Sequence, residues 1–132
     1  MSRFTENAVE ILLLAFLLII FLQSSTDKIF DWKGNLQWLT AHFSKTPFRA
    51  MVPTLLAIVL VTEAAAGILC TMGVFEILLG YPGNLAFIGA VLGCLALLML
   101  LLGQRVAKDY DGARTIAIYF VPAIFLVFLL QA

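Results

Sequence analysis

One acidic residue, Glu63, interrupts a long apolar stretch of the sequence near its middle. A charged carboxylate surrounded by hydrocarbon costs several kcal/mol, so such a group is protonated, paired or exposed to a wet cavity. Ala66, Gly67 and Cys70 follow on the same helical face, and these small residues let a second helix approach closely. The pattern is typical of two structures: a ligand or proton site, or a hydrogen-bonded clamp that only holds helices together.

A polar segment, residues 23–28, ends the first apolar stretch. Gln23 and Asp27 are four residues apart, so a helix would place them on one edge. Ser24 and Lys28 have the same spacing and extend that edge. One interpretation is a helix end whose lysine extends to the lipid headgroups. The other is the polar wall of a pocket.

A third polar cluster, residues 104–114, follows the third apolar stretch. Arg105 and Asp109 are four residues apart, as are Gln104 and Lys108, which predicts a helix that continues past the membrane surface. The cluster is either a solvated loop between helices or part of one pocket with the two features above. The pocket hypothesis assigns the ligand site to Glu63, Gln23, Asp27, Lys28, Gln104, Arg105, Lys108 and Asp109.

Two cysteines and one histidine are the remaining residues that often carry chemistry. Cys70 and Cys94 lack the CxxC spacing of redox and metal motifs. We expect them to differ in membrane depth by roughly 10–14 Å, which is too far for a disulfide. His42 has no second ligand near it in the sequence, so we expect a lone surface residue. The sequence therefore predicts no metal site and no catalytic residue.

Small residues form a stripe in the third apolar stretch, where Gly89 and Gly93 are flanked in helical register by Ala86 and Ala90. Such a stripe predicts close contact between helices, either within one bundle or between two protomers. We favour packing within one bundle, and we expect Gly67 to serve the same purpose in the second stretch.

The elements that must position these residues follow from composition. The chain has 132 residues, of which 63% are hydrophobic and 12% charged, with a mean hydropathy of +1.07. Soluble domains carry about 25% charged residues, so an ordinary soluble domain, a disordered tail and a coiled coil are excluded. Lysines and arginines equal the acids in number, which leaves no basic excess for binding nucleic acid.

Four stretches are long enough to cross a bilayer as helices, which requires about 20 residues each. We therefore expect an all-α integral membrane four-helix bundle in a single domain, residues 1–132. Because Glu6 and Glu10 flank the start of the first stretch, we interpret it as a retained span and not as a signal peptide. Asn84 is the expected N-cap of the third span. The four spans are expected at about residues 8–28, 51–73, 85–103 and 113–131.

Orientation follows from the lysines and arginines that flank the spans. Seven of them lie in the segments after spans one and three, against Arg3 alone on the opposite side. The positive-inside rule therefore predicts a multi-pass protein of the cell (inner) membrane, with both termini outside and the basic segments cytoplasmic. Segment 29–50, which contains Trp32 and Trp38, is long enough for a short helix lying in the membrane interface.

Three pieces of sequence carry a family resemblance: the polar segment 23–28, the motif Glu63-x-x-x-Gly67, and Gly103–Tyr110 with the sequence GQRVAKDY. In these pieces the chain resembles the DoxX-like family of small membrane proteins, and the resemblance covers essentially its whole length. The resemblance implies a four-helix fold and a link to thiosulfate:quinone oxidation or to membrane-associated oxidoreductase complexes.

The sequence contains no flavin, haem, iron–sulfur or nicotinamide motif, so we expect no intrinsic cofactor and no catalytic activity from this chain alone. The favoured hypothesis is an accessory or assembly subunit of a membrane complex, such as a redox complex, in contact with other subunits or a second copy. The alternative is a protein that binds quinone or lipid in a polar pocket around Glu63. Proton-coupled transport is a third hypothesis, but the sequence shows no inverted repeat to support it.

Overall fold

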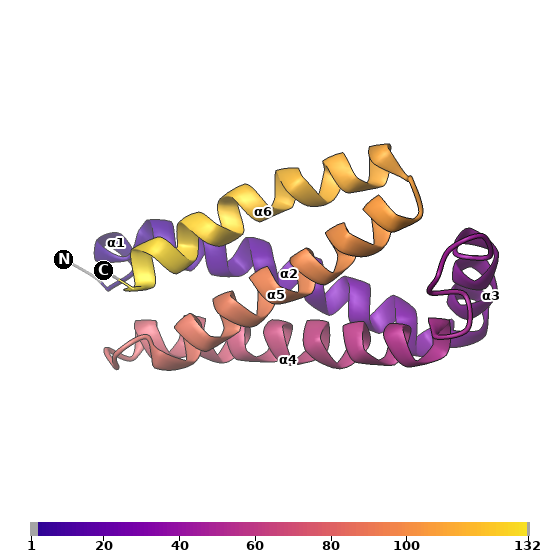
Figure 1. Ribbon diagram of the computed structural model, residues 1–132. Coiled ribbons are helices and arrows are strands. Elements are labelled where there is room, and N and C mark those ends of the chain that lie inside the picture. Colours follow the sequence, from indigo (N-terminus) through magenta and orange to yellow (C-terminus); the bar gives the residue numbers. More distant parts are fainter. Residues whose placement is uncertain (1–2, 132) are drawn as a thin grey trace.

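The computed structural model describes residues 3–131, and within that range the chain is helical with no strand. Four of the helices are long and apolar enough to cross a membrane, with mean hydropathies of 2.2–2.8. The prediction of an all-α four-helix membrane bundle is therefore confirmed, and the protein is a multi-pass membrane protein. The helices are α1 (Arg3–Glu6), α2 (Ala8–Phe30), α3 (Trp32–His42), α4 (Val52–Leu78), α5 (Asn84–Val106) and α6 (Tyr110–Gln131) (Figure 1).

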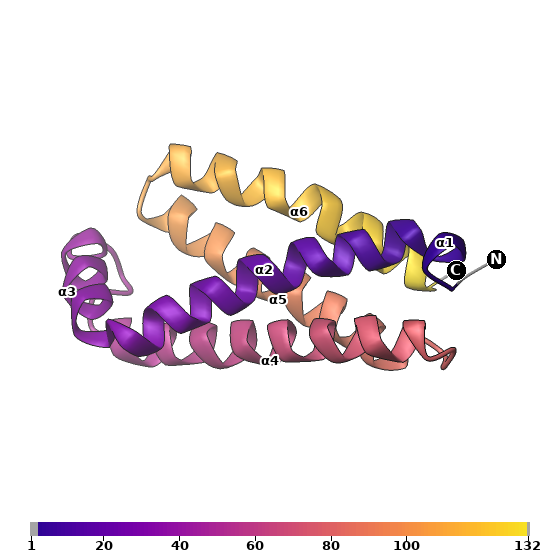
Figure 2. The same cartoon turned by 180° about the vertical axis from the view of Figure 1, so that it is seen from behind.

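The short helix α3 runs across one end of the bundle, beside the end of α2 and the start of α4 (Figures 1 and 2). A single residue, Asp31, separates α2 from α3, and its carboxylate accepts a hydrogen bond from Gly34 N at 3.3 Å. This N-cap satisfies one of the free amides at the start of α3. A helix in the segment 29–50 was expected, and the structure places it at Trp32–His42. We call the end of the bundle beside α3 the α3 end, and the opposite end, beside α1, the α1 end.

The core of the bundle combines large side chains of α2 with small residues of α4 and α5. Leu14, Leu17 and Phe21 of α2 are fully buried. The backbones of α4 and α5 approach so closely that a Cβ atom built on Gly89 would lie 2.8 Å from Cys70 N. A Cβ atom on Gly93 would lie 2.7 Å from the Phe21 ring. The small-residue stripe thus packs inside one bundle, where it lets helices approach each other.

The start of α5 is capped by a residue that the sequence analysis did not identify. Asn84 is the first residue of α5 and not its N-cap, which is Gly83, so that prediction was wrong. Glu76, in the last turn of α4, accepts hydrogen bonds from Leu85 N at 3.1 Å and from Ala86 N at 3.4 Å. A carboxylate at this position also interacts favourably with the positive end of the α5 dipole.

We predict that Glu76→Ala lowers the free energy of unfolding by about 0.5–2 kcal/mol, because two amides at the start of α5 lose their acceptor. Denaturant unfolding in detergent micelles measures the change. Asp111→Ala is the matched control, since Asp111 pairs with Arg114 in an exposed position and such pairs contribute about 0–1 kcal/mol. Equal losses in the two variants would contradict the capping role.

Candidate functional site

The buried acid of α4 is paired with the lysine of the polar segment. The Glu63 residue is 1% exposed, and Lys28 Nζ lies 2.8 Å from its Oε1. Lys28 Nζ also donates a hydrogen bond to Ser24 Oγ at 2.6 Å, one turn earlier in α2. A buried carboxylate was expected to be protonated, paired or exposed to a wet cavity, and in the structure Glu63 is paired.

One interpretation of the sequence was that the Lys28 side chain extends outward to the lipid headgroups, and the structure differs from it. Lys28 lies in the last turn of α2, whereas Glu63 lies about three turns into α4. The two helices meet at the α3 end, so an inward-pointing lysine side chain can reach the acid. Its side chain is only 15% exposed, because it extends into the bundle and not outward to headgroup level. The interpretation of Lys28 as a lysine that extends to the headgroups is therefore wrong.

The Glu63 carboxylate depends on this one cation. Glu63 Oε1 has no hydrogen-bond partner among the described residues, although the ammonium lies at ion-pair distance. Lys28 is therefore the cation that compensates the charge of Glu63 among the described residues. A buried pair of this kind contributes little net stability, but removing one partner leaves the other as an uncompensated charge.

A pocket of about 340 Å³ opens beside Lys28, between α3, α4 and α5. We call it the α3 pocket. Its polar lining consists of Lys28, Asn35 and Gln104, and the rings of Trp38, Phe43 and Phe48 also line it. Aliphatic side chains of α4 and α5 complete the walls, among them Leu55, Leu56, Val59, Met99 and Leu100. An apolar cavity with a few polar groups at one place is the usual form of a small-molecule site.

His42 holds α3 against the rest of the protein. Its Nε2 lies 3.1 Å from Gln104 Oε1 and 3.6 Å from Asp109 Oδ2. Its ring stacks on Trp38 with the centroids 4.5 Å apart. The expectation of a lone surface histidine was therefore wrong. A signal was available, because the predicted topology placed segments 29–50 and 104–114 on the same side of the membrane.

Only two of the eight residues assigned to the pocket, Lys28 and Gln104, line the α3 pocket, and four of the others lie apart from it and from the charged pair. Gln23 and Asp27 are exposed on the outside of α2. Arg105 is exposed and lies over the Tyr110 ring at 5.1 Å, and Lys108 is exposed in the turn between α5 and α6. The structure brings together Lys28 with Glu63, and Gln104 with Asp109 through His42.

The cysteines do not form a site with these groups. Cys70 and Cys94 are buried and free. Within residues 3–131 no three side chains of His, Cys, Asp or Glu are arranged to hold a metal ion.

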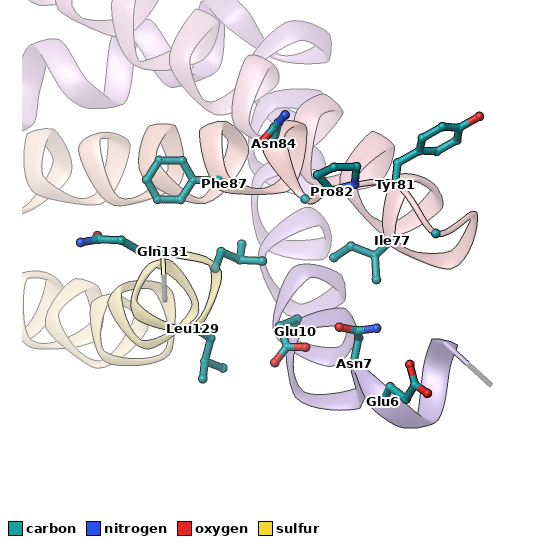
Figure 3. Close-up of a pocket in the computed structure, with 13 residues that line it drawn as sticks. Glu6, Asn7, Glu10, Ile77, Tyr81, Pro82, Asn84, Phe87, Leu129 and Gln131 are labelled. Atoms are coloured by element: carbon teal, nitrogen blue, oxygen red, sulfur yellow. The ribbon is translucent and has the colours of Figure 1, made fainter. Parts of the chain in front are cut away.

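A second pocket, of about 790 Å³, lies at the α1 end (Figure 3). Asn7 and Glu10 line one side of it, and the Tyr81–Asn84 turn lines another. The sequence analysis did not identify this pocket. Its two acids, Glu6 and Glu10, are not buried, in contrast to the charged pair beside the α3 pocket. We therefore base the candidate site on the smaller pocket.

No family model matches the chain, and the comparisons with curated proteins and with solved structures likewise found no match. The resemblance to the DoxX-like family therefore stays a prediction from the sequence. The case for a function depends on the α3 pocket and on the ion pair beside it.

Proposed function

We propose that this protein binds an amphipathic small molecule, a lipid or a quinone, in the α3 pocket and leaves it chemically unchanged. The observation that carries the proposal is the ion-paired Lys28 side chain among the residues that line an otherwise largely apolar cavity. A ligand with one polar end and one apolar end matches this lining, with its polar end at Lys28 and Gln104. The protein acts as a binding protein and does not itself catalyse a reaction.

Ligand binding has better support than the accessory-subunit hypothesis. Docking onto a larger complex was motivated partly by the small-residue stripe, and Gly89 and Gly93 face other helices of the same bundle. The DoxX-like resemblance agrees with the binding proposal, since it implies a link to quinone chemistry and a quinone is an amphipathic molecule. The lysine and arginine distribution supports a cytoplasmic position for the α3 end, in the cell (inner) membrane.

Filling the pocket tests the proposal. Val59 lines the pocket, and Val59→Trp should occupy its volume without adding a charge. Native mass spectrometry from detergent, with monoolein and decylubiquinone as probes, should detect a bound probe in the wild type. We expect Val59→Trp to lower its occupancy by about tenfold or more, because the indole takes the space of the ligand.

Val121→Trp is the matched control. Val121 is 66% exposed on α6, which contributes no residue to the pocket lining, so its replacement should leave probe occupancy unchanged. Equal occupancy in the two variants, or no bound probe in the folded wild type, would contradict the proposed function.

A further inference from the structure

The polar wall of the α3 pocket is electrically neutral. Lys28 is the only charged side chain that lines the pocket within the described part of the chain. The charge of Lys28 is balanced by the Glu63 carboxylate, whose Oε1 lies 2.8 Å from Lys28 Nζ. The arrangement therefore differs from a free lysine in a pocket, which would attract an anion.

An anionic head group would disturb this balance. It would place two negative charges beside one ammonium in a site of low dielectric constant, and the extra charge would have no partner. His42 and Asp109 belong to the adjoining contact between α3 and the turn after α5, and neither lines the pocket. No second cation in the pocket lining compensates an anion.

An uncharged head group with a hydrogen-bond acceptor can contact the polar lining of the α3 pocket without adding an uncompensated negative charge. An ammonium has three N–H donors, of which Ser24 Oγ accepts one and the Glu63 carboxylate faces another. The third N–H has no acceptor among the described residues, so a neutral acceptor oxygen in the pocket would satisfy it. The Gln104 carboxamide lines the pocket too, but its oxygen faces His42 and its nitrogen lies beside Gly112 of α6, so the donor for a ligand is Lys28.

We infer that the ligand of the α3 pocket has an uncharged head with acceptor oxygens, such as a carbonyl or an ester, on an apolar body. This inference rests on the proposed function and specifies its ligand class. The volume of about 340 Å³ lies at the lower end of the range of ligand pockets, roughly 300–1,000 Å³, which favours one chain or ring over two chains. The uncompensated charge of an anionic lipid lowers its affinity for the pocket, although the pocket contains a lysine.

A matched pair of probes tests the head group. Monoolein and oleoyl lysophosphatidic acid have the same chain and the same glycerol, and they differ by one phosphate. We expect the wild type to bind monoolein at least about tenfold more tightly in competition measured by native mass spectrometry, because the phosphate adds an uncompensated charge. Decylubiquinone in a parallel measurement distinguishes a quinone from a neutral glycerolipid as the preferred source of the carbonyl.

Glu63→Gln provides the decisive variant. It removes the charge that balances Lys28 and keeps the size of the side chain, so the pocket gains a net positive charge. We expect the preference to shift towards lysophosphatidic acid by about tenfold or more. The double variant Lys28→Met/Glu63→Gln is the control, because it restores neutrality and should not show this shift.

The outcomes separate the two proposals. If the wild type prefers lysophosphatidic acid, or if Glu63→Gln leaves the preference unchanged, the neutral-head inference is overturned. Binding that Val59→Trp still abolishes would in that case uphold the proposed function. If the folded wild type binds none of the three probes, both proposals are overturned.

Discussion

Replacing Lys28 by methionine should lower the free energy of unfolding by about 3–5 kcal/mol, the largest effect that we expect from a single substitution. Methionine keeps an unbranched apolar chain as far as Cε but lacks the terminal ammonium, so the Glu63 carboxylate loses its cation. The Glu63 residue is 1% exposed, and its Oε1 has no hydrogen-bond partner among the described residues. Thermal and denaturant unfolding in detergent micelles measure the loss.

The double variant Lys28→Met/Glu63→Gln separates loss of the ion pair from loss of packing. Removing both charges eliminates the uncompensated carboxylate, so we expect most of the stability to return. Lys108→Met is the control for the loss of a lysine, because Lys108 is exposed and should tolerate the change. If Lys28→Met alone were as stable as the wild type, the Glu63 carboxylate would not depend on Lys28 for compensation of its charge.

Gly73→Ala should produce the second large effect, a loss of about 1–3 kcal/mol. A Cβ atom at this position would lie 2.6 Å from Ala86 Cα, so α4 and α5 would have to separate. The higher helix propensity of alanine offsets about 1 kcal/mol of the strain, and the prediction is a net loss. The unfolding midpoint in detergent measures this loss.

Gly103→Ala is the matched control on α5. A Cβ atom there would first meet Phe43 Cζ at 3.4 Å, the outer end of a side chain that can move aside. We expect Gly103→Ala to be neutral or slightly stabilising, because only the propensity gain remains. Loss of stability in Gly103→Ala but not in Gly73→Ala would contradict the close α4–α5 contact.

The fold was predictable because its determinants are local. Twenty or so apolar residues in succession specify a spanning helix, whatever the rest of the chain does. The ends of the helices were less predictable. The helix α4 continues to Leu78, beyond the span expected at 51–73, and Glu76 near its end caps α5.

The candidate site was predictable only in part because its partners come from different helices. The need of Glu63 for a polar partner follows from its position in the sequence, and the structure supplies Lys28. Which residue of segment 23–28 turns inward depends on how α2 crosses α4, and spacing along one helix contains no such information. The same holds for His42 and Gln104, which are 62 residues apart in sequence.

The one-residue connection at Asp31 links membrane thickness to the α3 pocket. A spanning helix tilts to match the hydrocarbon layer around it. Because Asp31 alone separates α2 from α3, we expect a change in the tilt of α2 to move the start of α3. Trp38 of α3 and Lys28 of α2 both line the pocket. We therefore expect a thinner or thicker bilayer to change the shape of the cavity through the tilt of α2.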